Sequence, residues 1–127
     1  GVLFHMPVSA MKGRYVQELC TISENVLRRH GFDYLSMNWC SDRDMHQTTG
    51  IFFDRSDPAQ MQAAHACYHA LMQETSAAGF GNYRVSTHYM DEAAELFGPE
   101  LRGFLRSIKR AVDPAGILAP GKSGIHL

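Results

Sequence analysis

The sequence has few of the features that mark several large classes of protein. Its cysteines, Cys20, Cys40 and Cys67, are odd in number, widely spaced and form no zinc or redox motif. The formal net charge is −1, so no basic field indicates nucleic acid or anionic lipid as a partner. Apolar runs are far shorter than the roughly 20 residues of a membrane-spanning helix, and residues 1–6 lack the pattern of a signal peptide. We therefore expect a soluble protein, cytoplasmic or periplasmic, without a nucleic-acid or membrane partner.

A glycine-rich phosphate-binding loop is also missing. The segment Gly79-Phe80-Gly81-Asn82 is too short for one, and no helix is expected directly after it. What the chain does have is the composition of an ordinary globular unit, with 127 residues of which 45% are hydrophobic and 20% are charged. This length suggests one domain with a modest core, in which Cys20 and Cys67, both within helical patterns, are expected to be buried free thiols.

Hydrophobic periodicity predicts the order of the secondary-structure elements. The expected strands are residues 1–7, 32–40, 45–53 and 82–90, and the expected helices are residues 12–30, 58–78, 91–97 and 99–112. Asp57 is a good N-cap with Pro58 at the first helical position, and Gly31 is a typical C-terminal stop. This order predicts an α+β fold: a ferredoxin-like split βαβ antiparallel sheet with both long helices on one face and a C-terminal helical tail.

The segment Asp113–Gly124 follows the last predicted helix and is rich in turn-forming residues. Pro114 cannot continue the helix and biases Asp113 away from helical angles. The pair Pro120-Gly121 predicts a tight turn that presents one cation, Lys122. A turn of this kind can bring backbone and charge close to a flat anionic group, and the alternative is a solvated tail with a surface lysine.

Tyr83 and Arg84 stand at the head of the last predicted strand. Adjacent strand residues point to opposite faces, but at a strand end or a bend both can reach one cavity. There, the arginine would supply a fixed positive fork and the tyrosine hydroxyl a second donor for an anion such as a phenolate. The alternative is a surface arginine beside a half-buried tyrosine.

The histidines are candidates for proton transfer or for metal binding. His46 begins a predicted strand, where a structural histidine satisfied by one partner is the alternative to a catalytic role. His65 and His69 are four residues apart on a predicted helix, which is the spacing of two zinc ligands. Because an acidic base and a nearby third ligand are missing, we expect a solvated helix face there and no metal site.

Three ordered motifs resemble those of one flavoprotein family. They are Asp113–Gly124, Arg43-Asp44-Met45-His46 and Tyr83-Arg84-Val85-Ser86-Thr87, and Ile108–Pro114 is similar to the methylhydroxylase branch. The family is that of vanillyl-alcohol oxidase and p-cresol methylhydroxylase (4-cresol dehydrogenase), and its pattern can be followed without a gap from Pro7 to Gly124. The resemblance implies an FAD-dependent oxidoreductase that acts on para-substituted phenols.

The resemblance also assigns expected roles to residues of the site. Tyr83 and Arg84 match the family residues that hold the substrate phenolate, and His46 matches a histidine that faces the active site and can accept or relay a proton. The usual pattern has a second histidine where this chain has Gln47, which weakens any role that requires two imidazoles.

Three further residues match family positions around the substrate and the flavin. Met37 stands where relatives place a polar or acidic residue near the reacting carbon, and Phe4 matches an aromatic residue that lines the substrate ring. Both have an equally good alternative as core residues. Lys122 matches a lysine near the pyrimidine edge of the flavin. The resemblance implies that Arg84 would contact the flavin as well.

The resemblance further implies a domain organisation and a set of partners. FAD would be bound mainly by an N-terminal domain absent from this chain, so residues 1–90 are expected to form the substrate cap and residues 91–127 the C-terminal helices and flavin-facing tail. We expect such a chain to be inactive alone. The expected partners are a para-substituted phenol, the FAD-binding domain of the same enzyme, and further copies of the chain in a homo-oligomer such as a homodimer. The electron acceptor is either oxygen or a cytochrome c, and the sequence leaves both open.

A second interpretation keeps the predicted fold but assigns no enzymatic activity to the chain. In it the chain is a stand-alone, non-enzymatic ferredoxin-like module that uses its sheet face for a small ligand or for assembly. The missing cofactor domain supports this alternative. The reading frame upstream of Gly1 would discriminate the two, because a flavin-binding sequence there favours the enzyme and a start codon there favours the module.

Overall fold

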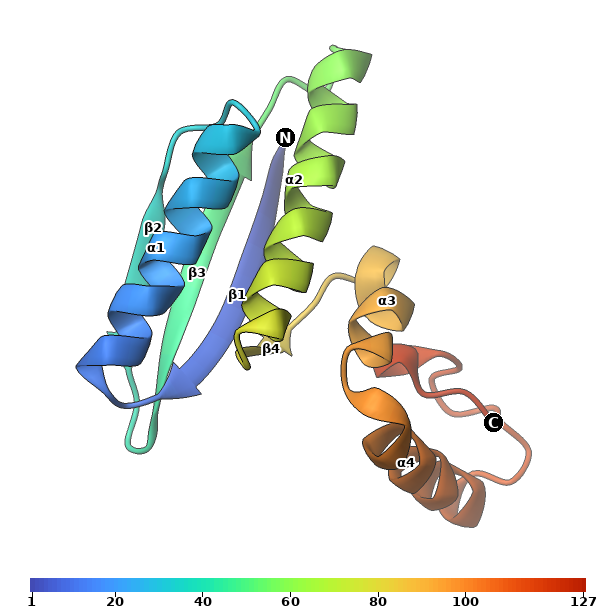
Figure 1. Ribbon diagram of the computed structural model, residues 1–127. Helices are drawn as coiled ribbons and strands as arrows, with labels where there is room; N and C mark the ends of the chain where they lie inside the picture. Colours follow the sequence, from blue (N-terminus) through green and yellow to red (C-terminus); the bar gives the residue numbers. More distant parts are fainter. The chain divides into compact units, whose positions relative to one another are not determined.

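The computed structural model describes residues 1–127, which form two units, Gly1–Arg84 and Val85–Leu127. In the first unit the elements are β1 (Val2–Ala10), α1 (Gly13–Arg29), β2 (Ser36–Cys40), β3 (Asp44–Phe52), α2 (Pro58–Ala77) and β4 (Gly81–Arg84). The strands form one antiparallel sheet in the order β2-β3-β1-β4. Helices α1 and α2 lie side by side on one face of it (Figure 1). The predicted ferredoxin-like α+β fold is confirmed.

The core of this unit lies between the sheet and its two helices. Alternate residues of the central strands point toward the helices, so the pleat of the sheet separates a buried face from an open one. The largest fully buried apolar side chains are Leu19, Val26 and Leu27 of α1, Met45 and Ile51 of β3, and Tyr68, Leu71 and Met72 of α2. Met61, in the first turn of α2, lies outside this core and is 37% exposed.

Local signals in the sequence set the ends of the two long helices. The Asp57 carboxylate accepts hydrogen bonds from the backbone N–H groups of Ala59 (2.9 Å) and Gln60 (3.2 Å), so it caps α2 as predicted. At the end of α1, Gly31 adopts a φ of 81°, which glycine tolerates without strain. Phe32 then donates a backbone hydrogen bond of 2.9 Å to the Leu27 carbonyl.

Two predicted strands are shorter in the structure. The strand expected from residue 32 begins only at Ser36, because Phe32 is held in the turn that closes α1. The strand expected over residues 82–90 ends at Arg84. The Tyr89 N–H bonds the Ser86 carbonyl at 3.0 Å, so the chain turns there and passes directly into a helix at Met90.

The second unit is helical and ends in a closed loop. Its elements are η1 (Thr87–Tyr89), α3 (Met90–Glu95), α4 (Gly98–Val112) and η2 (Lys122–Gly124). Gly98 separates the two helices with a φ of 79°, close to where the sequence predicted the break. The division at residue 90 into a cap and a flavin-facing tail stays a prediction. No helix in either unit is long and apolar enough to cross a membrane.

His5 is a fully buried histidine of β1, on the face toward the helices. Its Nε2 lies 3.3 Å from the Thr75 hydroxyl, while its Nδ1 is buried and has no hydrogen-bond partner. Burial lowers the pKa of His5 from its ordinary 6.5 to about 3. The unfolded chain therefore binds one more proton than the folded protein between these two pH values, and stability is lost as the pH falls through this window.

We expect His5→Leu to remove this part of the acid sensitivity. The substitution keeps an apolar body, and Thr75 retains its 2.7 Å bond to the Leu71 carbonyl. Between pH 6 and pH 4, the free energy of unfolding of the wild type should fall more steeply than that of the variant, by up to about 1.4 kcal/mol per pH unit. Urea unfolding at several pH values measures both slopes, and equal slopes would contradict a neutral buried His5.

Candidate functional site

The sheet face opposite α1 and α2 carries large exposed apolar side chains. Its exposed members are Val2, Phe4, Met37, Trp39, Phe52 and Tyr83. Phe4 is 45% exposed and Met37 is 61% exposed, so the alternative that either is a core residue is wrong. Exposed apolar surface of this extent is typical of a face that meets a ligand or another protein surface.

A β-bulge brings Tyr83 and Arg84 to this same open face. In the pairing of β4 with β1, Arg84 opposes Met6 and Asn82 opposes Pro7, which leaves Tyr83 as an extra residue without a partner. The normal alternation is therefore interrupted between Tyr83 and Arg84. The Arg84 guanidinium lies 5.7 Å from the centre of the Tyr83 ring. Tyr83 and Arg84 were expected to reach one cavity only at a strand end or a bend, and this bulge is such a bend.

Three aromatic rings gather beside Arg84 on the open face. The His46 ring stacks on Trp39 with centroids 5.3 Å apart and an interplanar angle of 7°. Tyr83 meets His46 edge-to-face at 4.5 Å and Trp39 at 6.2 Å. Arg84 forms no ion pair, so all its N–H donors are open to an anionic ligand. The structure thus brings together Tyr83, Arg84 and His46, the three residues predicted to be catalytic.

His46 is hydrogen-bonded through only one of its two ring nitrogens. Its Nε2 lies 3.0 Å from Oδ1 of Asp44, and its Nδ1 is buried with no hydrogen-bond partner. The histidine side chain is 16% exposed under its aromatic neighbours. It is therefore not a fully satisfied structural histidine, because one ring nitrogen keeps an unused hydrogen-bonding capacity.

Gln47, which replaces the second histidine of the family pattern, points away from the site. It is fully buried on the helix side of the sheet, where Ser23 donates a 2.7 Å bond to its amide oxygen. Its amide nitrogen donates to the Cys20 sulfur at 3.4 Å. A residue here cannot reach the open face that holds His46. Cys67 is buried as predicted, but the prediction that Cys20 is buried is wrong, since it is partly exposed.

The register places Met37 in the same cross-strand row as Arg84. Met37 pairs with Thr48, and Arg84 pairs with Met6, which lies beside Thr48 in the β1–β3 register. Three strand spacings separate the two edges, so the Cα atoms of Met37 and Arg84 are roughly 14 Å apart. Met37 and Arg84 therefore lie at opposite edges of the same open face.

Sequence reasoning missed Trp39 and Asp44 as members of this cluster. The signal was present in the alternation of the strands. Trp39 is two residues from Met37 and Asp44 is two residues from His46, so each shares the face of a residue already chosen.

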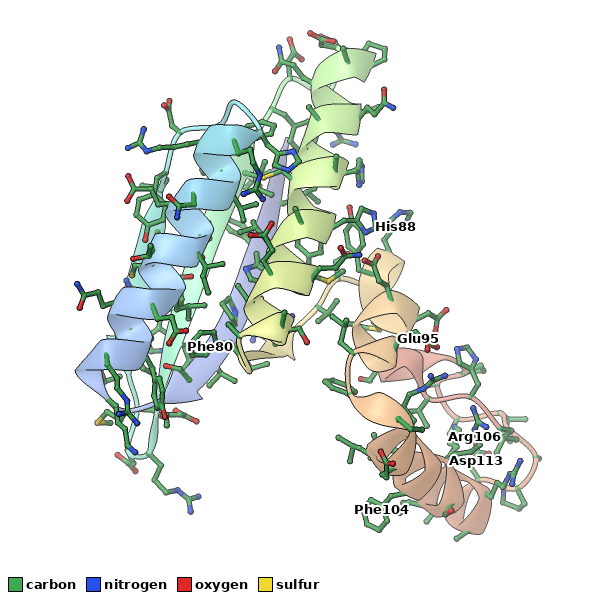
Figure 2. All side chains as sticks on the ribbon, viewed as in Figure 1. Phe80, His88, Glu95, Phe104, Arg106 and Asp113 are labelled. Carbon is green, nitrogen blue, oxygen red and sulfur yellow. The ribbon has the colours of Figure 1, made fainter.

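The C-terminal segment is a fixed loop. The Asp113 carboxylate is buried and accepts backbone N–H bonds from Ile117 (3.1 Å) and Leu118 (3.0 Å), just beyond the end of α4 (Figure 2). Its ion pair with Lys109, together with these two N–H groups, holds the pKa of Asp113 below its ordinary value. The predicted helix stop at Asp113 is confirmed.

The predicted turn before Lys122 is also present. Gly121 has a φ of 71°, and the Lys122 N–H bonds the Ala119 carbonyl at 3.1 Å. Gly124 packs so closely on α3 that an added Cβ would lie 2.3 Å from the Ala94 side chain. Lys122 itself forms no ion pair, so a rigid backbone presents an uncompensated ammonium group.

Each unit carries an exposed cation without an ion pair, and the glycines after α2 do not form a phosphate cradle. Arg84 and Lys122 are unpaired cations of the kind that stabilise a group gaining negative charge. Gly79 instead lies between α2 and β4 and Gly81 is the first residue of β4, so no helix N-terminus follows them to bind phosphate.

His65 and His69 lie on α2, and no three histidine, cysteine, aspartate or glutamate side chains of the chain gather as a metal site would require. We expect His65→Ala and His69→Ala to leave activity and metal content unchanged in the complete enzyme. Elemental analysis and steady-state kinetics test both variants. Stoichiometric zinc in the wild type that is lost in either variant would overturn the expectation.

A ferredoxin-like sheet with one open face defines an α+β domain that offers this face to a ligand or to a second domain. Residues 9–123 match the family model described as FAD linked oxidases, C-terminal domain. The chain belongs to this family, which confirms the resemblance inferred from its motifs.

Relatives and solved structures agree with this assignment. The chain is 38% identical over its whole length to the 4-cresol dehydrogenase [hydroxylating] flavoprotein subunit of Pseudomonas putida, of which it covers 24%. Over 96% of its length it is 26% identical to the 1'-carboxy-chondrochloren decarboxylase of Chondromyces crocatus, covering 23% of that protein.

Two solved structures match nearly the entire chain. A substrate-bound p-cresol methylhydroxylase matches 99% of the chain with a TM-score of 0.92 and 37% identity, and the chain covers 24% of that structure. The 4-ethylphenol oxidase from Gulosibacter chungangensis, in complex with isoeugenol, matches 99% of the chain with a TM-score of 0.89 and 32% identity, and 25% of it is covered. The chain thus spans about a quarter of the length of the relatives it matches.

Proposed function

We propose that this chain forms the substrate cap of an FAD-dependent oxidoreductase that acts on para-substituted phenols. The observation that carries the proposal is the bulge in β4, which turns Tyr83 and Arg84 to one face beside His46. The names of the relatives support the substrate class, since they include a 4-cresol dehydrogenase subunit and a 4-ethylphenol oxidase.

Tyr83 and Arg84 bind the substrate oxygen as phenolate. The guanidinium stays charged at every relevant pH and has no carboxylate partner, so it favours the anion over the neutral phenol. The Tyr83 hydroxyl is a second donor. Loss of the phenol proton pushes electron density toward the para carbon and prepares its substituent for oxidation. FAD, which would be held mainly by a separate domain of the same enzyme, would supply the hydride acceptor, and loss of hydride from the benzylic carbon would leave a quinone methide.

His46 is the group of this chain that accepts or relays the proton. It lies in ring contact with Tyr83 and retains an unpartnered nitrogen. Met37 cannot act as a base toward water or an alcohol, so it lines the pocket with Phe4 at the substrate's apolar end. Water then adds to the quinone methide or the intermediate rearranges.

The C-terminal loop serves the flavin. Lys122 would be the cation of the second unit that is offered to the flavin, where it would stabilise the negative charge that reduction brings. Arg84 is separately proposed as a cation of the first unit that the flavin would also meet. Because one relative is a flavoprotein subunit, the proposed partners also include a cytochrome c electron acceptor, besides a second copy of the enzyme.

Equilibrium binding tests this proposal apart from catalysis. The complete flavin-containing enzyme is titrated with 4-chlorophenol, which has no benzylic hydrogen to give to the flavin, and with its methyl ether, and the flavin absorbance reports binding. We expect the phenol to bind at least about tenfold more tightly, since only the phenol can become the anion that Arg84 requires. Equal affinity for both ligands would contradict a phenolate site.

A further inference from the structure

The contact between Asp44 and His46 determines which nitrogen of His46 is able to take a proton. Both residues lie on β3, two positions apart and therefore on the same face of the sheet. Oδ1 of Asp44 lies 3.0 Å from Nε2 of His46. A carboxylate only accepts hydrogen bonds, so Nε2 carries the proton.

The other nitrogen supports the same tautomer independently. Nδ1 of His46 is buried and has no partner. A proton on Nδ1 would be a buried donor without an acceptor, which is an unfavourable state, whereas a bare lone pair there costs less. The Nε2 contact and the Nδ1 environment are separate observations and select the same protonation pattern.

The surroundings of the pair hold this arrangement in place. The Ser41 hydroxyl donates to the Asp44 carboxylate, and the Ser41 N–H bonds the Asp44 carbonyl at 2.9 Å. The stack of His46 on Trp39 fixes the plane of the imidazole. Asp44 is thus anchored in the β2–β3 turn, and His46 is restrained both at its edge and at its face.

We propose that Asp44 is a positioning residue that fixes His46 as the Nε2–H tautomer, so that Nδ1 is the atom that takes the substrate proton. This inference rests on the proposed phenol oxidation. In the step, the phenol O–H bond breaks, its proton goes to Nδ1, and its electron pair stays on the oxygen held by Arg84. The carboxylate of Asp44 stabilises the resulting imidazolium. Tyr83, whose ring contacts His46, is 38% exposed, so a shift of this ring toward the bound phenol oxygen would uncover Nδ1 while the stack on Trp39 stays in place.

The test uses Asp44→Asn in the complete flavin-containing enzyme. The asparagine keeps an oxygen for Ser41, but its amide donates to Nε2 and reverses the tautomer. With ¹⁵N-labelled histidine, the NMR chemical shifts of the two His46 ring nitrogens report the tautomer. The two resonances are assigned by their absence from the spectrum of His46→Gln. We expect protonated Nε2 in the wild type and protonated Nδ1 in Asp44→Asn. The rate of flavin reduction by a para-alkylphenol should fall about 10- to 100-fold while KM changes little.

Asp42→Asn is the matched control, because Asp42 is exposed in the same turn and forms no ion pair. It should keep the wild-type tautomer and rate. Protonated Nδ1 in the wild type overturns the inference even if Asp44→Asn does not fold, and so does a reversed tautomer with an unchanged rate. If the wild type does not oxidise phenols at all, the proposed function fails, while the nitrogen shifts still report whether Asp44 sets the tautomer.

Discussion

Arg84→Ala should lower kcat/KM for para-alkylphenols by about 10²- to 10³-fold in the complete enzyme. The substitution removes the one permanent charge that the bulge of β4 places beside Tyr83 on the open face. Loss of a single donor aimed at a developing or bound anion has an effect of this size in other enzymes. The loss should be larger for phenols of high pKa, because these depend most on the guanidinium to become phenolates.

Arg14→Ala is a matched control for this variant. Arg14 also contacts a neighbouring tyrosine, with its guanidinium 4.7 Å from the Tyr15 ring centre, but it lies at the start of α1. Steady-state kinetics with a series of substituted phenols compares the two variants. An unchanged kcat/KM in Arg84→Ala would remove Arg84 from the site, and a similar loss in Arg14→Ala would show that the effect is not specific.

Lys122→Met should lower the reduction potential of the flavin and slow its reduction. The Pro120-Gly121 turn fixes the backbone, and Lys122 has no ion-pair partner that would neutralise it. A cation aimed at charge that appears on reduction stabilises the reduced state more than the oxidised state. We expect a decrease of at least about 30 mV, which for a two-electron couple corresponds to about 1.4 kcal/mol.

A redox titration of the holoenzyme beside stopped-flow reduction measures both effects. Arg110→Met is the matched control, since it removes a positive charge from α4 in the same unit. Folding should be unaffected in both variants, because neither side chain forms an ion pair. If Lys122→Met leaves both potential and rate unchanged, Lys122 is an ordinary surface lysine.

Local sequence signals predicted the order of the helices and strands. They did not predict the features that depend on pairing between strands far apart in the sequence. The Asp57 cap and the break at Gly98 depend on neighbouring residues, and both are present in the structure. The strand through Pro7 was expected to end there, but β1 continues to Ala10 because residues 8–10 pair with residues 44–46 of β3. The pairing of β1 with β4 shifts its register between Met6 and Pro7. Proline lacks a backbone N–H and is tolerated within a sheet mainly at edges and bulges, so Pro7 was the available signal for the bulge.

The candidate site was predictable as a set of residues and not as an arrangement. Motifs selected Tyr83, Arg84 and His46, and the structure places all three on one face. The stack of Trp39 on His46 depends on the pairing of β2 with β3, which the periodicity of one strand does not determine. For the same reason, sequence alone left Phe4 undecided between a place in the core and one beside the substrate ring, and its exposure on the open face excludes the core.

Anaerobic mixing of the complete enzyme with 4-methylphenol tests the proposed phenol oxidation most directly. The substrate's methyl ether, 4-methylanisole, serves as a control of nearly the same shape that cannot become a phenolate. If Tyr83 and Arg84 activate the substrate by holding its anion, 4-methylphenol should bleach the flavin absorbance in a single turnover and 4-methylanisole should leave it oxidised. Reduction by both compounds at similar rates, or by neither, would contradict this mechanism.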